Sequence, residues 1–109
     1  MRRGELWTLQ DDGYASKPRP VVIVQSDRLA QLESVTLCLI TSCEAPAMST
    51  RVRIEPSEAN GLRSTSYVMT DKIASVRRSM LGKHIGSLAD ADMAKVTDAL
   101  AIVLGIEPR

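Results

Sequence analysis

Short apolar runs separated by polar, proline-containing segments dominate the first half of the chain. The run VVIV at 21–24 follows Pro20 directly, and the run VTLCLI occupies residues 35–40. Continuous runs of this length, rich in β-branched residues and bounded by turn residues, are typical of strands buried on both faces. We therefore expect two central strands, over residues 20–24 and 35–40.

Other segments alternate between apolar and polar residues. Residues 51–54 read RVRI, which predicts a strand with one wet face, and residues 66–73 set Tyr67 and Met69 opposite Val68 and Thr70. Residues 74–76 extend this second strand or form a strand pair with it. A further short strand is expected over residues 4–9, whereas residues 81–85 are equally compatible with a strand and a loop.

The C-terminal fifth has a helical period instead. Apolar residues recur at spacings of three, four and three, at Met93, Val96, Leu100 and Val103. Asp90 and Asp92 fall in the first turn and Gly105 follows the last, as is typical of helix ends, so we predict a helix over residues 90–104. A shorter helical turn, capped by Ser26, is expected over residues 26–32.

These patterns predict a mainly β protein with one C-terminal amphipathic helix. Five or six short strands followed by a helix suggest a small, strongly curved antiparallel sheet or barrel with the helix packed on it. A length of 109 residues fits a single domain spanning 1–109, and an apolar fraction of 44% is large enough for a core. Aromatic residues make up only 3% of the chain, which disfavours an RNA-binding sheet that relies on stacked aromatic rings.

Charge and cysteine content narrow the picture further. The formal net charge of +1 lacks the bulk excess of many phosphate-binding proteins, although a local basic face is compatible with it. Cys38 and Cys43 do not form a CxxC motif, so we expect reduced thiols, one buried and one near a loop, and no metal site. No apolar segment resembles a signal peptide or a membrane span, which predicts a cytoplasmic protein without a membrane partner.

Few residues stand out as candidates for chemistry. His84 is the only histidine, but it lies in a basic segment with no paired nucleophile, which favours a structural role. Arg19 lies between Pro18 and Pro20 at the start of a predicted buried strand, so its backbone is restricted and its guanidinium is suited to hold a phosphate. An ordinary surface arginine at a loop end explains the same pattern equally well. Thr41, which follows the second buried strand, and Ser42 also read as turn-forming hydroxyls.

Several segments together resemble one family. RGELW, RPVVIVQSD, VTLCLITS, GLRSTSYVMTDKI and IGSLADADMAKVTDALAIVLGI occur in order and cover nearly the whole chain. In this combination they are similar to the MazF/PemK family of toxin endoribonucleases. The resemblance implies an SH3-like (CcdB/PemK-type) barrel of about five to seven strands with a C-terminal helix, a homodimer, and a cognate MazE-like antitoxin peptide as partner.

The resemblance also implies a reaction. Members of this family cleave single-stranded RNA without a metal or cofactor: the ribose 2′-OH attacks the adjacent phosphate, which leaves 2′,3′-cyclic phosphate and 5′-OH ends. The arginine of the RP motif and the threonine that ends the next strand correspond to Arg19 and Thr41 here. Residues expected by resemblance to contact RNA are Tyr14, Ser16, Lys17, Ser42, Thr70, Asp71 and Lys72.

Two other functions compete with this one. A gyrase poison of the CcdB type has a similar fold but depends on a C-terminal Trp-Gly-Ile, whereas the sequence after Leu104 contains no tryptophan. A catalytically silent barrel that only binds a partner is also compatible with the sequence, because fold does not dictate function. Replacing Arg19 separates these functions, since only RNA cleavage requires it.

Overall fold

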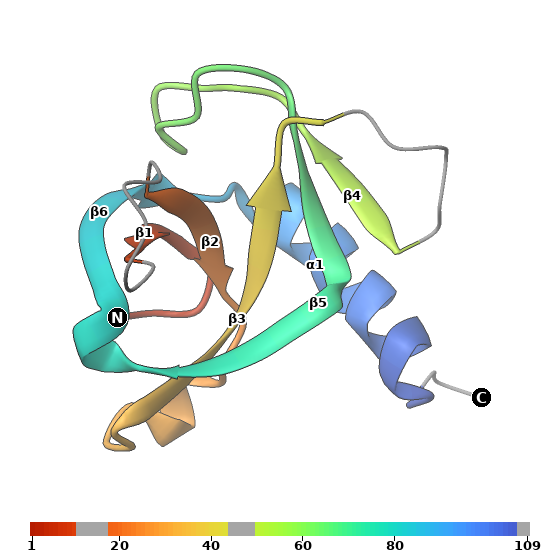
Figure 1. The fold of residues 1–109 in the computed structure, drawn as a ribbon. Helices are drawn as coiled ribbons and strands as arrows, with labels where there is room; N and C mark the ends of the chain where they lie inside the picture. The colour runs from red at the N-terminus through yellow and green to blue at the C-terminus, as the bar shows by residue number, and fades with distance from the viewer. Residues whose placement is uncertain (11–17, 44–49, 107–109) are drawn as a thin grey trace.

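The computed structural model describes residues 1–10, 18–43 and 50–106 (Figure 1). The described part contains six strands, one α-helix and two short 3-10 helices. Their bounds are β1 Glu5–Leu9, β2 Arg19–Ile23, η1 Asp27–Leu29, β3 Ser34–Thr41, β4 Arg51–Ile54, β5 Ser66–Arg77, η2 Arg78–Met80, β6 Leu81–Ser87 and α1 Asp90–Leu104. The mainly β fold with one C-terminal helix is thus confirmed.

All six strands form one antiparallel sheet in the order β4-β5-β3-β2-β1-β6. Figure 1 shows that this sheet is strongly curled, with β5 and β6 passing around β1 and β2. The segment that the sequence left undecided is β6, which pairs with β1 although it contains Gly82 and Gly86. Tertiary pairing therefore overrides the weak strand propensity of glycine here.

The curl is concentrated in β5, which the sequence suggested as a strand with an extension or a strand pair. Met69 pairs with Leu39, but the next pair joins Ile73 to Cys38, so three residues of β5 have no counterpart on β3. Extra residues of this kind bend a strand and increase its twist. Figure 1 shows β5 turning sharply along its length, so one bent strand of 12 residues replaces the expected pair.

The loop between β4 and β5 crosses to the far edge of the sheet. The Ser87 N–H of β6 donates to the Ala59 carbonyl at 2.9 Å. Gly61 has φ +71°, and a Cβ there would lie 2.0 Å from the Ile85 carbonyl oxygen, so only glycine permits this approach. The loop therefore connects the two edge strands β4 and β6 and draws the curled sheet toward a closed shape.

The core lies on both faces of the central strands, as predicted. Val22 and Cys38 belong to one buried cluster, together with Val96 of α1. Val21 and Leu37, which point the other way, belong to a second buried cluster. Because β2 and β3 are covered on both faces, their positions are fixed more firmly than those of the edge strands.

Helix α1 has the bounds that the apolar spacing predicts. Val96 and Ala99 are its buried residues, and its contacts are with β4 and β5. Gly105 ends the helix in the left-handed conformation with φ +70°, and its N–H donates to the Ile102 carbonyl at 3.2 Å. In the part of the chain that the structure describes, no helix is long and apolar enough to cross a membrane.

Candidate active site

Arg19 and Thr41 lie beside each other at one end of the central strands, because β2 and β3 are antiparallel neighbours. Arg19 begins β2 and Thr41 ends β3. The register pairs Val21 with Leu39, and the same register carried two residues further sets Arg19 opposite Thr41. Directly opposed residues of an antiparallel pair lie on the same face of the sheet. The two expected catalytic side chains therefore start from adjacent backbone positions on one face.

The flanking residues restrict both side chains. Pro18 and Pro20 restrict the backbone on either side of Arg19, which is exposed at the start of β2. The Oγ1 atom of Thr41 accepts a hydrogen bond from the Cys43 N–H at 3.1 Å. A hydroxyl can accept and donate at once, so this contact orients Thr41 and leaves its O–H proton available to a ligand.

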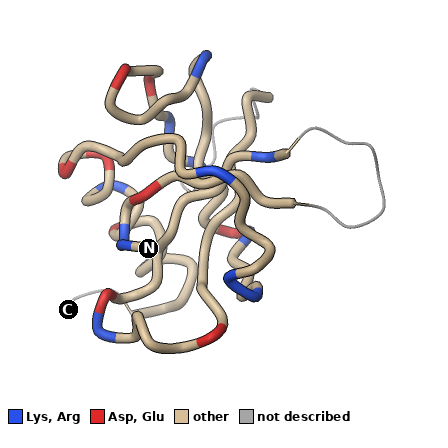
Figure 2. The backbone as a smooth tube through the Cα atoms, turned by 90° about the vertical axis from the view of Figure 1, so that its left-hand side faces the viewer, with Lys and Arg blue, Asp and Glu red and all other residues tan. Residues whose placement is uncertain are grey.

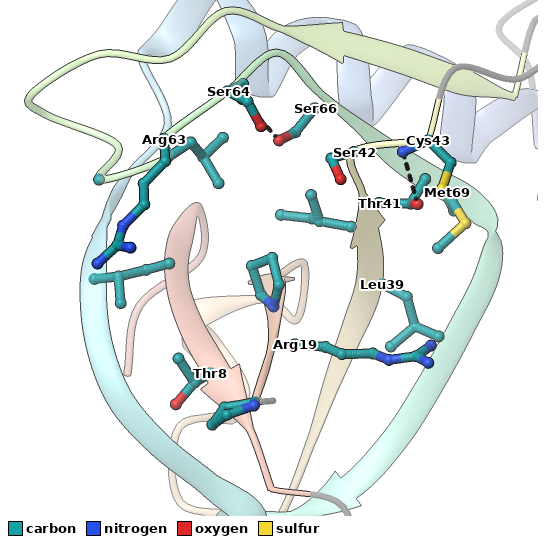
Figure 3. A pocket seen from close by; sticks show the side chains of 16 residues that line it. Thr8, Arg19, Leu39, Thr41, Ser42, Cys43, Arg63, Ser64, Ser66 and Met69 are labelled. Carbon is teal, nitrogen blue, oxygen red and sulfur yellow. Dashed lines mark hydrogen bonds between the residues drawn. The ribbon is translucent and has the colours of Figure 1, made fainter. Parts of the chain in front are cut away.

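Arg19, Thr41 and Ser42 line one cavity of about 1080 Å³. This volume is slightly above the range of about 300–1,000 Å³ that is usual for ligand pockets. Figure 3 shows Arg19 and Thr41 on one side of the cavity and Arg63 across from them. Other parts of the wall come from β1 and β6, through Thr8 and Ile85, and from β5 and the loop between β4 and β5, through Gly61, Leu62, Ser64, Ser66 and Met69.

The cavity is electrostatically suited to an anion. Arg19 and Arg63 are its cations, and no aspartate or glutamate is among the described residues that line it. In the view of Figure 2, basic and acidic positions alternate along the backbone, and the basic positions do not form one continuous group. Because the net charge is only +1, this local pair of guanidinium groups, and not the overall charge, favours a phosphate-bearing ligand.

The residues of β5 that are expected to contact RNA lie outside the cavity. Thr70 is fully buried, and its hydroxyl donates to the Thr50 carbonyl at 2.5 Å. Its assignment to the RNA surface is therefore wrong, because the alternation of β5 sets Thr70 on the same buried face as Val68. Asp71 lies 3.3 Å from Arg51, between Oδ1 and Nε, which makes an ion pair without an aligned hydrogen bond.

Neither Asp71 nor Lys72 lines the cavity, although both are exposed. These two residues belong to the unopposed part of β5, so the alternation of an ordinary strand does not apply to them. Tyr14, Ser16 and Lys17 lie outside the described residues.

His84 occupies a separate structural cluster on β1 and β6. Its ring lies 5.2 Å from that of Trp7, and its Nε2 lies 3.9 Å from Oε2 of Glu5. Burial acts to raise the pKa of Glu5. The hydrogen bonds that its carboxylate accepts from the Arg2 N–H and from Trp7 Nε1, together with the charge of nearby His84, outweigh this effect, so the pKa of Glu5 lies below its ordinary value. His84 does not line the cavity, in agreement with the structural role expected for it.

The two thiols differ as predicted. Both cysteines are free; Cys38 is buried in the core, whereas Cys43 is exposed and lines the cavity. Burial raises the pKa of the Cys38 thiol to about 11, so this group stays protonated and unreactive at neutral pH. Within the described residues, no group of three or more His, Cys, Asp or Glu side chains could hold a metal ion.

Sequence reasoning missed Arg63, Ser64 and Ser66. They are more than 20 residues from either predicted catalytic residue, and the Asn60-Gly61 pair before them indicated only a turn. The missing signal is the close approach of Gly61 to β6, a long-range contact that no local pattern records.

Comparison with known proteins adds to this geometry. A family model described as "PemK-like, MazF-like toxin of type II toxin-antitoxin system" matches residues 2–104. The chain is 44% identical over 107 residues to a protein of Mycolicibacterium smegmatis described as "Probable endoribonuclease MazF", which covers 97% of this chain and 98% of that protein.

Solved structures agree in fold. An endoribonuclease in complex with its cognate antitoxin, from a mycobacterial species, superposes with a TM-score of 0.83 at 28% identity and covers 100% of this chain and 99% of that chain. The Mycobacterium tuberculosis toxin MazF-mt6 superposes with a TM-score of 0.79 at 25% identity and covers 94% of this chain and 98% of that chain.

Proposed function

The chain belongs to the PemK-like, MazF-like toxin family of type II toxin-antitoxin systems, and from this premise we propose that it is a toxin that cleaves single-stranded RNA. The observation that carries the proposal is that Arg19 and Thr41 lie beside each other at the ends of β2 and β3, where both line one cavity. No aspartate or glutamate is among the described residues that line this cavity. This is an arrangement that can stabilise a reacting phosphate by hydrogen bonds and positive charge alone.

In the proposed reaction the ribose 2′-OH attacks the adjacent phosphorus. The O2′–P bond forms, the P–O5′ bond breaks, and a proton is lost from O2′ while another reaches O5′. The products are a 2′,3′-cyclic phosphate and a 5′-OH end. Negative charge builds up on the non-bridging oxygens of the phosphorane, where preorganised donors have their greatest effect.

We assign the stabilisation of this charge to Arg19. A guanidinium offers paired N–H donors in a planar fork that matches two phosphate oxygens, and its position at the mouth of a buried strand limits its motion. Thr41 donates its remaining hydroxyl proton to a phosphate oxygen, while Cys43 N–H holds the threonine oxygen in place. Ser42, Tyr14, Ser16 and Lys17 complete the proposed RNA-contacting set.

The proposed nucleophile accounts for selectivity toward RNA. DNA lacks the 2′-OH, so a DNA strand in the same position has no group that can attack the phosphorus. Cleavage of RNA inside the cell stops translation and growth, which is consistent with a cytoplasmic site of action.

We also propose a homodimer and a cognate antitoxin peptide as partners. Apolar side chains at and just after the end of α1 are exposed: the exposed fraction is 47% for Ile102, 57% for Leu104 and 69% for Ile106. A second copy that covers these side chains would remove them from water. The antitoxin is supported by the similar mycobacterial endoribonuclease, whose structure contains its cognate antitoxin.

The test is incubation of purified protein with a long unstructured RNA in the presence of EDTA, followed by mapping of the product ends. We expect discrete cuts with cyclic-phosphate ends for the wild type and no cuts for Arg19→Ala. Arg28→Ala, which removes an exposed arginine on η1, is the matched control and should cut normally. RNA left intact by folded, antitoxin-free wild type would refute the proposal.

A further inference from the structure

Arg63 is a second cation in the cavity that the reaction above does not use. It extends from the loop between β4 and β5, and Figure 3 shows it on the opposite side of the cavity from Arg19. Among the described residues, no acid forms an ion pair with Arg63 and no group accepts a hydrogen bond from it. Its five N–H donors therefore remain available to a ligand.

The backbone that carries Arg63 is held firmly on both sides. Before it, the buried side chain of Asn60 accepts hydrogen bonds from Ser57 N–H at 3.0 Å and Leu62 N–H at 2.9 Å, and it donates to the Glu55 carbonyl at 2.9 Å. After it, the Ser66 hydroxyl donates to the Ser64 carbonyl at 2.9 Å.

The contact with β6 fixes the same loop against the rest of the sheet. Ser87 N–H binds the Ala59 carbonyl, and Gly61 packs directly on the Ile85 backbone. Arg63 thus starts from a defined point relative to Arg19, although the two residues belong to different walls. A loop that is held in place presents the base of the Arg63 side chain from a fixed position, which favours a role in ligand positioning.

The two walls cannot serve the same phosphate equally. Arg19 lies beside Thr41, whereas Arg63 lies on the opposite side of a cavity of about 1080 Å³, with its side chain directed toward β6 (Figure 3). RNA carries one phosphate per nucleotide, so a strand with one phosphate at Arg19 has further phosphates that a cation on another wall can bind.

We propose that Arg63 binds the phosphodiester next to the scissile one and so positions the RNA strand in the cavity. The inference rests on the proposed ribonuclease function and deepens it. Arg63 is a positioning residue: it contributes to the affinity for RNA equally in the ground and transition states, and it leaves the chemical step to Arg19 and Thr41.

The test uses an oligoribonucleotide that contains one cleavage site mapped with the wild type. Arg63→Ala should raise KM about tenfold, keep kcat within about twofold, and reduce the slope of log affinity against log salt by about one. Arg63→Lys should recover part of the affinity, because a lysine still supplies a charge. Arg77→Ala is the matched control, since Arg77 is exposed at the end of β5 and does not line the cavity.

A neutral linkage identifies the phosphate. A methylphosphonate placed at the contacted position next to the cleavage site should weaken wild-type binding about tenfold and have little effect on Arg63→Ala, because both changes remove the same contact. Unchanged KM and salt slope in Arg63→Ala, or additive effects at every flanking linkage, would overturn the inference while leaving the function intact. A wild type that cuts no RNA would overturn the function and this inference with it.

Discussion

Asn60→Ala probes the loop that connects the two edge strands and forms one wall of the cavity. Asn60 is only 3% exposed, and its side chain makes three hydrogen bonds to backbone groups of residues 55, 57 and 62. Alanine removes all three bonds and keeps the backbone path. The Ser57 and Leu62 N–H groups and the Glu55 carbonyl then lose their partner in a partly buried environment.

The expected cost follows from these contacts. A neutral hydrogen bond contributes a net free energy of about 1 kcal/mol, so three of them predict a loss of about 3 kcal/mol in the free energy of unfolding. For a domain of this size such a loss lowers Tm by roughly 10–20 °C. Asn60→Asp keeps the acceptor for the two N–H groups but buries a carboxylate whose second oxygen faces the Glu55 carbonyl oxygen, so it should also destabilise the fold.

Urea unfolding followed by Trp7 fluorescence measures both variants. We expect a lower midpoint for both variants than for the wild type, with the m-value unchanged. A loss below about 1 kcal/mol for Asn60→Ala would refute the view that this side chain holds the loop.

Three further outcomes follow from the described residues. The Glu5 pKa lies below its ordinary value of 4.5, so the contribution of Glu5 to stability is present above that value and is lost as the pH falls through the folded pKa. In urea titrations at different pH values, Glu5→Gln should therefore show a smaller fall in the free energy of unfolding between about pH 5 and 3 than the wild type. Iodoacetamide should label one thiol of the native protein, Cys43, and inhibit RNA cleavage, whereas labelling of buried Cys38 before unfolding, seen by mass spectrometry, would contradict the structure. Leu37→Ala should cost about 2–5 kcal/mol in urea unfolding, because Leu37 is fully buried in the second core cluster, and a smaller cost would mean that the cluster is loosely packed.

Local patterns predicted the elements whose packing repeats along the chain. The spacing of Met93, Val96, Leu100 and Val103 sets a helix that the structure places at the predicted residues. The apolar runs marked β2 and β3 because a strand buried on both faces needs apolar residues at successive positions. In contrast, β6 has few apolar residues, and its pairing with β1 decides its conformation.

The site divides in the same way. Arg19 and Thr41 were expected together from the family resemblance, and in the structure they are neighbours because each stands at the end of a strand and the register brings the two ends together. Thr70 was misplaced because the family resemblance, and not the strand pattern, assigned it to RNA, whereas the regular alternation of β5 sets Thr70 on the buried face with Val68. Arg63 was missed because its place depends on a loop that folds across the sheet.

The most direct test of the central claim is single-turnover cleavage of an oligoribonucleotide whose mapped site carries one deoxyribose in place of the attacking ribose. We predict that this single change abolishes cleavage, and that Arg19→Ala lowers the rate on the all-ribose strand by about 10²–10³-fold with Tm unchanged. Cleavage of the deoxyribose strand, or a wild-type rate in Arg19→Ala, would contradict 2′-OH attack at a phosphate held by Arg19.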